Sequence, residues 1–217
     1  MASGIAHEIR NPLAAISIAA EQLAECKRIE DVPKLAARCK RITARITKIV
    51  DGLSSFARDA TADPFVTAGV GQIVADTLEL CQRRFAAHEV DLSVPAVPPA
   101  LVVECRPVQI EQVLVNLLNN AHDAVESAAE RWVRLEIEST ADRLEISVTD
   151  SGRGIPGELR RQIFEPFFTT KGPGRGTGLG LSVSRGLAEA HQGTLELDEH
   201  AAHTRFVLRL PLHQRAG

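Results

Sequence analysis

Residues 112 to 125 read QVLVNLLNNAHDAV and lie within a longer stretch, Pro107 to Ala128, in which apolar residues recur with a helical period. The apolar stripe consists of Ile110, Leu114, Leu117, Ala121 and Ala124. The opposite stripe consists of Gln109, Gln112, Asn116, Asn119, Asn120 and Asp123. A face that only meets water usually carries Lys, Glu and Arg, which favour helices more than Asn does. We expect a helix whose amide-rich face is either a ligand site or the solvent side of a capped surface helix.

The sequence around this helix alternates between two periods. Helical periods cover residues 70–85 and 177–191. Strand-like alternation is carried by Val133, Leu135 and Ile137, by Leu144, Ile146 and Val148, and by Phe206, Leu208 and Leu210. This mixture predicts an α+β sandwich with helices on one face of a mixed sheet.

The first sixty residues follow a different rule. Apolar residues recur there at steps of four and three, a heptad seam formed by Leu35, Cys39, Ile42, Ile46, Ile49, Leu53 and Phe56. An earlier seam with the same rhythm runs from Ile5 to Leu23. We expect a helical hairpin with its turn near residues 29–33, paired with a second copy in a four-helix bundle. Packing of the hairpin on its own chain is the alternative. The expected domains are residues 1–60 and 66–217, with a linker at 61–65.

The composition excludes several classes of protein. The 217 residues are 44% hydrophobic and 24% charged, which is typical of a folded soluble protein and not of a disordered or collagen-like chain. We find no apolar run long enough for a membrane helix and no signal peptide, so we expect no direct membrane contact. A net charge of −3 argues against nucleic acid as a partner. The four cysteines form no CxxC pair, which favours a reducing, cytoplasmic location with unpaired thiols.

One histidine has a chemically suggestive setting. His7 lies in GIAHEIRNPLAAI (residues 4–16) and falls on the outside of the predicted bundle, where a histidine alone is usually a solvated surface residue. A neutral imidazole is a good nitrogen nucleophile, and a carboxylate that accepts from Nδ1–H would leave Nε2 free to attack. Pro12 cannot donate to the carbonyl of Glu8, which loosens the helix just beyond His7.

Glycines gather near the C-terminal end of the chain. Residues 152–157 match GxGxxG, but Pro156 interrupts any following helix and no acidic residue stands about 20 positions later, so a dinucleotide fold is excluded. A Walker A loop is also excluded, because Lys171 is followed by glycine. Residues 172–176 (GPGRG) predict a mobile lid. The next stretch, GTGLG (176–180), leads into a helix, and free amides at a helix start bind phosphate.

Together these stretches resemble the sensor histidine kinases of two-component signalling, in the subtype that includes the nitrogen-regulation kinases. GIAHEIRNPLAAI resembles their phosphoacceptor box and QVLVNLLNNAHDAV their N box. VTDSGRGIP (148–156), IFEPFFTTK (163–171) and GTGLG resemble the G1, F and G2 boxes. The boxes follow the family's order over residues 7–193. The catalytic domain of these kinases belongs to the ATPase superfamily shared with gyrase and MutL.

The resemblance assigns roles to individual residues. His7 would be phosphorylated, with Glu8 as its helper base, and Asn11 would align water in a phosphatase reaction. Asn120 would bind Mg²⁺, and Asp150 would accept a hydrogen bond from adenine. The remaining nucleotide contacts would come from Asn116, Asp123, Gly152, Gly154, Lys171, Arg175, Gly176, Thr177, Gly178, Leu179 and Gly180.

The resemblance therefore predicts an ATP-dependent protein-histidine kinase that is a homodimer and passes its phosphoryl group to a response-regulator aspartate. Two alternatives remain open. One is a scaffold or phosphatase-biased protein that binds nucleotide without phosphorylating itself. The other is a hydrolytic ATPase, which Gln112 disfavours because many relatives carry glutamate there. Only six residues precede His7. We therefore expect either a shortened form of a longer protein or a chain without its input segment. The sequence does not decide whether the parent protein is tethered to a membrane.

Overall fold

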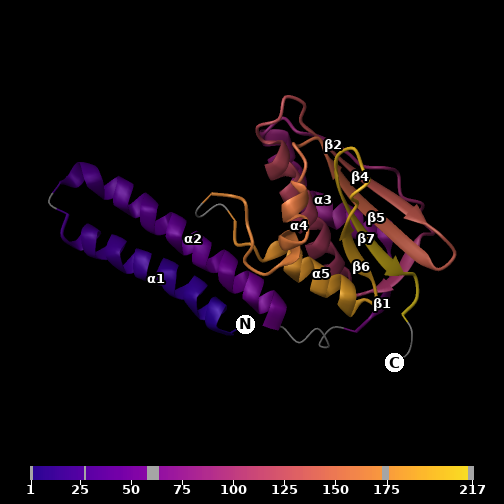
Figure 1. Ribbon diagram of the computed structural model, residues 1–217, viewed down its shortest axis with the longest axis horizontal. Helices are drawn as coiled ribbons and strands as arrows, with labels where there is room; N and C mark the ends of the chain where they lie inside the picture. The colour runs from indigo at the N-terminus through magenta and orange to yellow at the C-terminus, as the bar shows by residue number, and fades with distance from the viewer. Residues whose placement is uncertain (1, 27, 58–63, 173–175, 215–217) are drawn as a thin grey trace. The chain divides into compact units, whose positions relative to one another are not determined.

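The computed structural model describes residues 2–26, 28–57, 64–172 and 176–214. The chain divides into two compact units: residues 1–58 with 167–179, and residues 59–166 with 180–217. Figure 1 shows the two long helices of the first unit and the helices and strands of the second. Most of the expected linker, residues 61–63, lies outside the described residues.

The N-terminal part of the first unit is a helical hairpin. Its helices are α1 (Ala2–Ala24) and α2 (Val32–Ala57), joined by a turn that contains the short 3-10 helix η1 (Ile29–Asp31). The two helices pack against each other (Figure 1), as the heptad spacing predicts. Helical backbone continues through Pro12 without a break.

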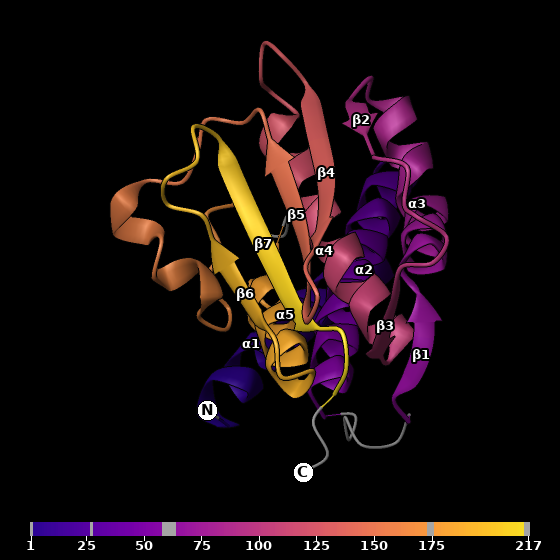
Figure 2. The same ribbon diagram turned by 90° about the vertical axis from the view of Figure 1, so that its right-hand side faces the viewer.

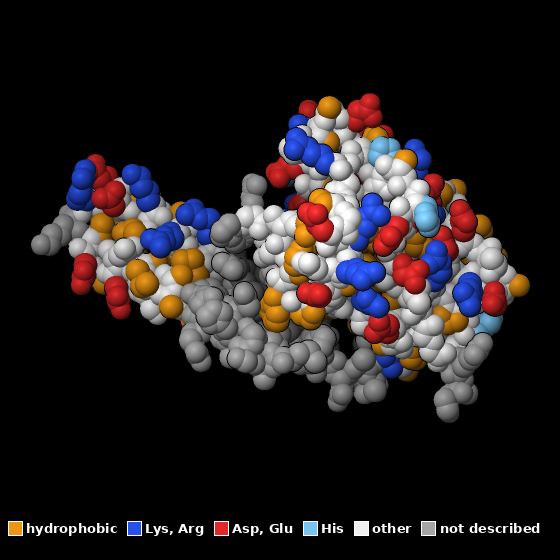
Figure 3. Space-filling view, viewed as in Figure 1, with side chains coloured by type: hydrophobic (Ala, Val, Ile, Leu, Met, Phe, Trp, Pro, Cys, Tyr) orange, Lys and Arg blue, Asp and Glu red, His pale blue; other side chains and the backbone are white. Residues whose placement is uncertain are grey.

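The hairpin leaves apolar surface uncovered. Ala19 is fully buried, whereas the side chains of Leu13 and Ile18, on the same helix, are about half exposed. Hydrophobic side chains are visible along this part of the molecule in Figure 3. Such a surface is typical of a helix pair that binds another apolar face.

The second unit is built on a five-stranded mixed sheet. Its strands, in spatial order, are β2 (Asp91–Ser93), β4 (Trp132–Ser139), β5 (Arg143–Asp150), β7 (Thr204–Pro211) and β6 (Thr194–Leu197). The first pair is parallel and the other three are antiparallel. A separate antiparallel pair consists of β1 (Val66–Gly69) and β3 (Val102–Cys105). Two short 3-10 helices follow β5, η2 (Gly157–Leu159) and η3 (Gln162–Phe164).

Three helices cover one face of this sheet, as Figure 2 shows. They are α3 (Val70–Ala87), α4 (Pro107–Val125) and α5 (Gly180–Ala190). Alternate residues of β5, namely Leu144, Ile146 and Val148, are about 1% exposed and form the sheet side of the core. Among the described residues, no helix is long and apolar enough to cross a membrane.

The opposite face of the sheet carries a network of ion pairs. Arg209 binds Glu145 at 2.8 Å and Glu196 at 2.7 Å, while Arg205 binds Asp198 at 3.2 Å. These pairs join three neighbouring strands with charges of both signs. Figure 3 likewise shows acidic and basic side chains interspersed on the second unit.

Segments near the two ends of the described second unit meet at one buried histidine, His191. His191 Nδ1–H donates to the carbonyl of Leu187 at 2.7 Å, and Nε2 accepts from the backbone N–H of Arg106 at 3.1 Å. The ring of Phe65 meets the imidazole edge to face at 5.1 Å, and Gln214 donates to the His191 carbonyl at 3.2 Å. Burial, followed by the charge of Arg106, lowers the pKa of His191, so the ring is neutral.

The expected α+β architecture is confirmed, with helices on one face of a mixed sheet. The three strands predicted from alternation are β4, β5 and β7. The other four strands have only three or four residues each, too few for alternation to reveal. The helix predicted from Thr177 begins instead at Gly180.

Candidate functional site

The residues predicted for phosphoryl chemistry, His7, Glu8 and Asn11, all lie on α1. Residues four apart on a helix share one side, so Asn11 follows His7 on the same side one turn later. Glu8 is rotated by about 100° from His7. The side chains of residues 2–12 lie outside the described part of the structure, so the roles of these three residues stay predictions.

The amide-rich helix forms as α4. It begins with Pro107, whose missing N–H costs nothing in a first turn. Ile110, Leu114 and Leu117 are fully buried, which directs the opposite side of the helix away from the core. The predicted ligand residues Asn116, Asn120 and Asp123 are only partly buried.

The predicted apolar stripe is wrong at its C-terminal end. Ala124 is exposed, whereas His122, which the stripe omits, is fully buried. His122 packs edge to face on Phe85 of α3, with 5.1 Å between the ring centroids. At this end α4 is therefore covered by α3 as well as by the sheet.

Asn116 joins α4 to the start of α5. Its Nδ2 donates to the hydroxyl of Ser184 at 2.9 Å. Its Oδ1 lies so close to Gly180 that a Cβ there would overlap the oxygen, so this approach requires glycine. The residue predicted to face phosphates thus also positions the N-terminus of α5, where free N–H groups favour anions.

Asn119 and Asp123 are held by an arginine of α3. Arg84 Nη1 donates to Asn119 Oδ1 at 2.7 Å, and Arg84 Nη2 forms an ion pair with Asp123. The side chains of Arg84 and Asp123 are 41% and 24% exposed. This pair places one positive and one negative charge at the edge of the amide-rich face.

Asp150 is a buried carboxylate at the end of β5. It is 3% exposed, and its Oδ1 accepts from the N–H of Gly152 at 2.9 Å. Burial raises the pKa of Asp150 to about 6, although the hydrogen bond from Gly152 opposes this effect. Gly154, the next predicted glycine, has a φ of 80°. A carboxylate buried in this way is well suited to accept a hydrogen bond from a ligand donor.

The two ends of the segment 167–179 are hydrogen-bonded to each other. The N–H of Phe167 donates to the carbonyl of Gly178 at 2.9 Å. Gly178 has a φ of 67°, and a Cβ there would overlap the Phe167 carbonyl carbon, so glycine is required. Within the loop, the backbone N–H of Lys171 bonds the hydroxyl of Thr169 at 3.1 Å.

The other predicted loop residues are placed as follows. Thr177 accepts a hydrogen bond from the N–H of Leu179 at 3.4 Å, and Leu179 is buried. Gly176 lies close to Thr169, whose hydroxyl would be 2.7 Å from an added Cβ. Arg175 lies outside the described residues.

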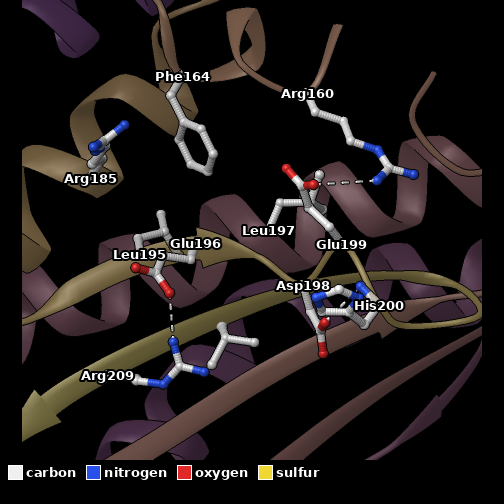
Figure 4. Close-up of a pocket in the computed structure, with 11 residues that line it drawn as sticks. Arg160, Phe164, Arg185, Leu195, Glu196, Leu197, Asp198, Glu199, His200 and Arg209 are labelled. Carbon is white, nitrogen blue, oxygen red and sulfur yellow. Dashed lines mark hydrogen bonds and ion pairs between the residues drawn. The ribbon is translucent and has the colours of Figure 1, made fainter. Parts of the chain in front are cut away.

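A separate hollow of about 470 Å³ lies beside β6. In Figure 4, Phe164 and Arg185 lie together on one side of the hollow, and Arg160 reaches toward Glu199. Arg160 pairs with Glu199 at 3.8 Å, Arg209 with Glu196, and Arg185 with Glu189 at 3.1 Å. Because carboxylates already pair these three arginines, the hollow is a poor site for a phosphate chain.

The amide-rich face of α4 carries a residue type that can bind a hard cation. Among the described residues, no three His, Cys, Asp or Glu side chains gather as a metal site. The amide oxygen of Asn120 is a neutral ligand for a hard cation. This fits Mg²⁺ that keeps most of its ligands from phosphate and water, as Mg²⁺ usually does at nucleotide sites.

Sequence reasoning missed the residues that hold the site in place. Ser184 and Arg84 contact predicted ligand residues, but each lies on a different helix from its partner. The only sequence signal was their position on amphipathic helices. Nothing in that pattern links Arg84 to Asn119, 35 residues later.

Comparisons with known proteins identify two family domains in the chain. The family model described as histidine kinase-, DNA gyrase B-, and HSP90-like ATPase matches residues 105–214. The His kinase A (phospho-acceptor) domain matches residues 1–61. Two-component sensor PprA of Pseudomonas aeruginosa is 35% identical over 226 residues, covering 98% of this chain and 24% of PprA. Sensor histidine kinase ZraS of Klebsiella oxytoca is 32% identical over 200 residues, covering 91% of this chain and 42% of ZraS.

Solved structures give the same result. Histidine kinase ThkA in complex with response regulator protein TrrA matches 98% of this chain and 61% of that chain, with a TM-score of 0.76 and 25% identity. The catalytic domain of ThkA alone matches 69% of this chain and 99% of that chain, with a TM-score of 0.61 and 29% identity. The chain spans less than half the length of PprA and ZraS.

The fold and the family matches place an ATPase-type domain and a phospho-acceptor domain in one chain. The chain belongs to the histidine kinase-, DNA gyrase B- and HSP90-like ATPase family, and its N-terminal part matches the His kinase A phospho-acceptor domain. The predicted kinase family is thus confirmed for both domains.

Proposed function

We propose that the chain is the catalytic core of a cytoplasmic sensor histidine kinase of the nitrogen-regulation subtype. It would transfer the γ-phosphoryl group of ATP to His7 and then to a response-regulator aspartate. The observation that carries this proposal is the presence of a phospho-acceptor domain and an ATPase domain in one chain. The corresponding boundaries would be residues 1–60 for phosphotransfer, 61–65 for the linker and 66–217 for ATP binding.

In this proposal the second unit holds the nucleotide by its two ends. Asp150 would accept from the exocyclic amino group of adenine, because its buried carboxylate has a pKa of about 6 and is mostly ionised at neutral pH. The N-terminus of α5 would face the phosphates. Asn120 would hold Mg²⁺, which neutralises phosphate charge when bound.

The loop would complete the site. Residues 172–176 would form its lid, with Lys171 and Arg175 neutralising phosphate charge. The G2 stretch, residues 176–180, would present backbone N–H groups to the phosphates. Glycines in such a loop lose much entropy on ordering, so closure would accompany nucleotide binding.

At the phosphoacceptor, Nε2 of His7 would attack the γ-phosphorus in line. The new N–P bond would form as the bond to the β,γ-bridging oxygen breaks, and ADP would leave with that electron pair. Glu8 would accept from Nδ1–H and so stabilise the positive charge that develops on the imidazole. Because His7 and the nucleotide belong to different domains, the linker would have to bring them together.

The proposed partners are a second copy of the chain and a response regulator. The half-exposed Leu13 and Ile18 support pairing of two hairpins into a four-helix bundle. ThkA was solved in complex with a response regulator protein, which supports a similar partner here. Asn11, one turn after His7, would align water for dephosphorylation of that regulator.

Labelling with [γ-³²P]ATP and Mg²⁺ tests the kinase reaction. The wild type should acquire an acid-labile, alkali-stable label, as expected for a phosphoramidate, and His7→Ala should acquire none. His200→Ala, which removes an exposed histidine of the second unit, should label like wild type. Label that persists in His7→Ala would refute the proposed acceptor.

A second assay separates transfer from dephosphorylation. Asn11→Ala should slow the loss of phosphate from a phosphorylated response regulator while leaving autophosphorylation intact. Asn120→Ala should slow autophosphorylation while leaving dephosphorylation of the response regulator intact. A chain that never labels but dephosphorylates the regulator would support the phosphatase-biased alternative.

A further inference from the structure

Arg84 is the one residue outside the predicted boxes that, within the described structure, is shown to bond two side chains of the amide-rich face. Its guanidinium reaches from α3 across to α4, donating to Asn119 Oδ1 at 2.7 Å and pairing with Asp123. A guanidinium can hold two acceptors at once because its donors are arranged in a rigid fork. The two contacted residues lie four positions apart, on one side of α4.

These bonds decide what Asn119 and Asp123 can offer a ligand. The amide oxygen of Asn119 is already an acceptor for Arg84, so its NH₂ group is the part left to donate. Donors suit phosphate oxygens. Asp123 alone would repel a phosphate chain, but its ion pair with Arg84 cancels that charge.

A buried histidine also lies near Asp123. His122 Nδ1 lies 3.7 Å from Asp123 Oδ1, but His122 is fully buried. Its Nε2 is 3.0 Å from Nδ1 of His88. Arg84 Nη2 lies closer to Asp123 Oδ1 than His122 Nδ1 does, so Arg84 is the direct ion-pair partner of this carboxylate.

We propose that Arg84 is a positioning residue for polyphosphate binding: it neutralises Asp123 and turns the amide of Asn119 so that α4 presents donors to the phosphates. This inference rests on the proposed ATP site. In it Arg84 acts through its two partners on α4.

Substitutions at both ends of the pair test the inference in the full chain. Arg84→Ala should weaken Mg-ATP binding about tenfold, as expected for loss of a charge-assisted pair beside a polyanion. Asp123→Asn in the same chain should restore the affinity to within about threefold of wild type, because the uncompensated carboxylate is gone. Arg83→Ala is the matched control, since it removes the same charge from the neighbouring exposed residue of α3.

The number of phosphates supplies a readout that a purely structural role would not change. Affinities of adenosine, Mg-ADP and Mg-ATP are measured by competition against a fluorescent nucleotide. The penalty of Arg84→Ala should be small for adenosine and grow with each added phosphate. KM for ATP should rise in autophosphorylation while kcat stays near wild type.

Three results would overturn the inference. They are an equal penalty for adenosine and Mg-ATP, a double variant as weak as Arg84→Ala, and a loss no larger than that of Arg83→Ala. Failure of the wild type to bind any of the three ligands would instead remove the proposed ATP site itself, and the inference with it.

Discussion

Replacing Asp150 with asparagine should stabilise the protein and weaken nucleotide binding at the same time. The carboxylate is 3% exposed, and burial raises its pKa from 3.8 to about 6. The folded state therefore binds a proton more tightly than the unfolded state between these two pH values. Stability falls as pH rises through that window, and at pH 7.5 the full penalty is present. Asparagine keeps the shape of the side chain and its acceptor for Gly152 while removing the charge.

The size of the stabilisation by Asp150→Asn follows from the pKa shift of Asp150. About 2 pKa units, at 1.36 kcal/mol each, amount to roughly 3 kcal/mol at pH 7.5. At about 2 to 4 °C per kcal/mol for a domain of this size, Asp150→Asn should raise the midpoint of thermal unfolding by roughly 6 °C or more. At pH 4 wild type and variant should unfold at nearly the same temperature, because Asp150 is then protonated in the folded state.

Nucleotide affinity should change in the opposite direction. An ionised carboxylate accepts strongly from the adenine amino group, and an amide does so less well. We expect Asp150→Asn to weaken Mg-ADP binding by about tenfold at pH 7.5. Wild-type affinity should also fall below pH 6, as Asp150 becomes protonated, whereas the affinity of the variant should change little.

Calorimetric scans with and without Mg-ADP at pH 4 and 7.5 measure both effects. Destabilisation by Asp150→Asn at pH 7.5 would contradict the assignment of Asp150 as a buried charge. Unchanged affinity with the expected stabilisation would contradict its role toward adenine. Glu145→Gln, on the water-facing side of the same strand, is the control and should not stabilise the protein.

Three further changes test particular contacts. Gly178→Ala should break the contact between Gly178 and Phe167, because alanine there has an unfavourable φ and its Cβ would overlap the Phe167 carbonyl carbon. We expect faster tryptic cleavage within residues 168–177, and an unchanged rate would contradict the prediction. Ser184→Ala should weaken Mg-ADP binding about fivefold by releasing Asn116, about 1 kcal/mol of lost hydrogen bonding; equal affinity by calorimetry would argue that the bond is dispensable. His191→Leu should lower the free energy of unfolding by about 2 kcal/mol at pH 7.5, because a buried N–H loses its acceptor. Denaturant titrations should show a smaller difference between wild type and variant at pH 5.5. At that pH the unfolded wild type protonates His191, whereas the folded wild type does not because its His191 pKa is lowered, so wild type loses stability.

The sequence predicted best where one period governs a long segment. The stripe from Ile110 to Ala121 gave α4 and the direction of its amide face because a single side of that helix meets the core. The stripe failed at His122, because α3 covers a second side there and buries a polar ring. A single apolar stripe in the sequence gives no sign that a second side of the helix is buried.

Contacts between distant segments were beyond prediction. The strands β2 and β6 are too short to alternate visibly, and they exist because neighbouring strands supply their hydrogen bonds. Arg84 and Ser184 belong to no recognisable motif, and their importance arises only when α3 and α5 pack beside α4. Asp150 was singled out by its box, but its burial depends on the completed sheet.

The contacts around His191 have a mechanical consequence. Phe65, near the beginning of the second unit, and Gln214, near its end, both attach to this one residue. Phe65 directly precedes β1, so a pull on the chain there would load the β1–β3 pair and also α5, through the ring contact with His191. Local opening around His191 would therefore release both of these segments together.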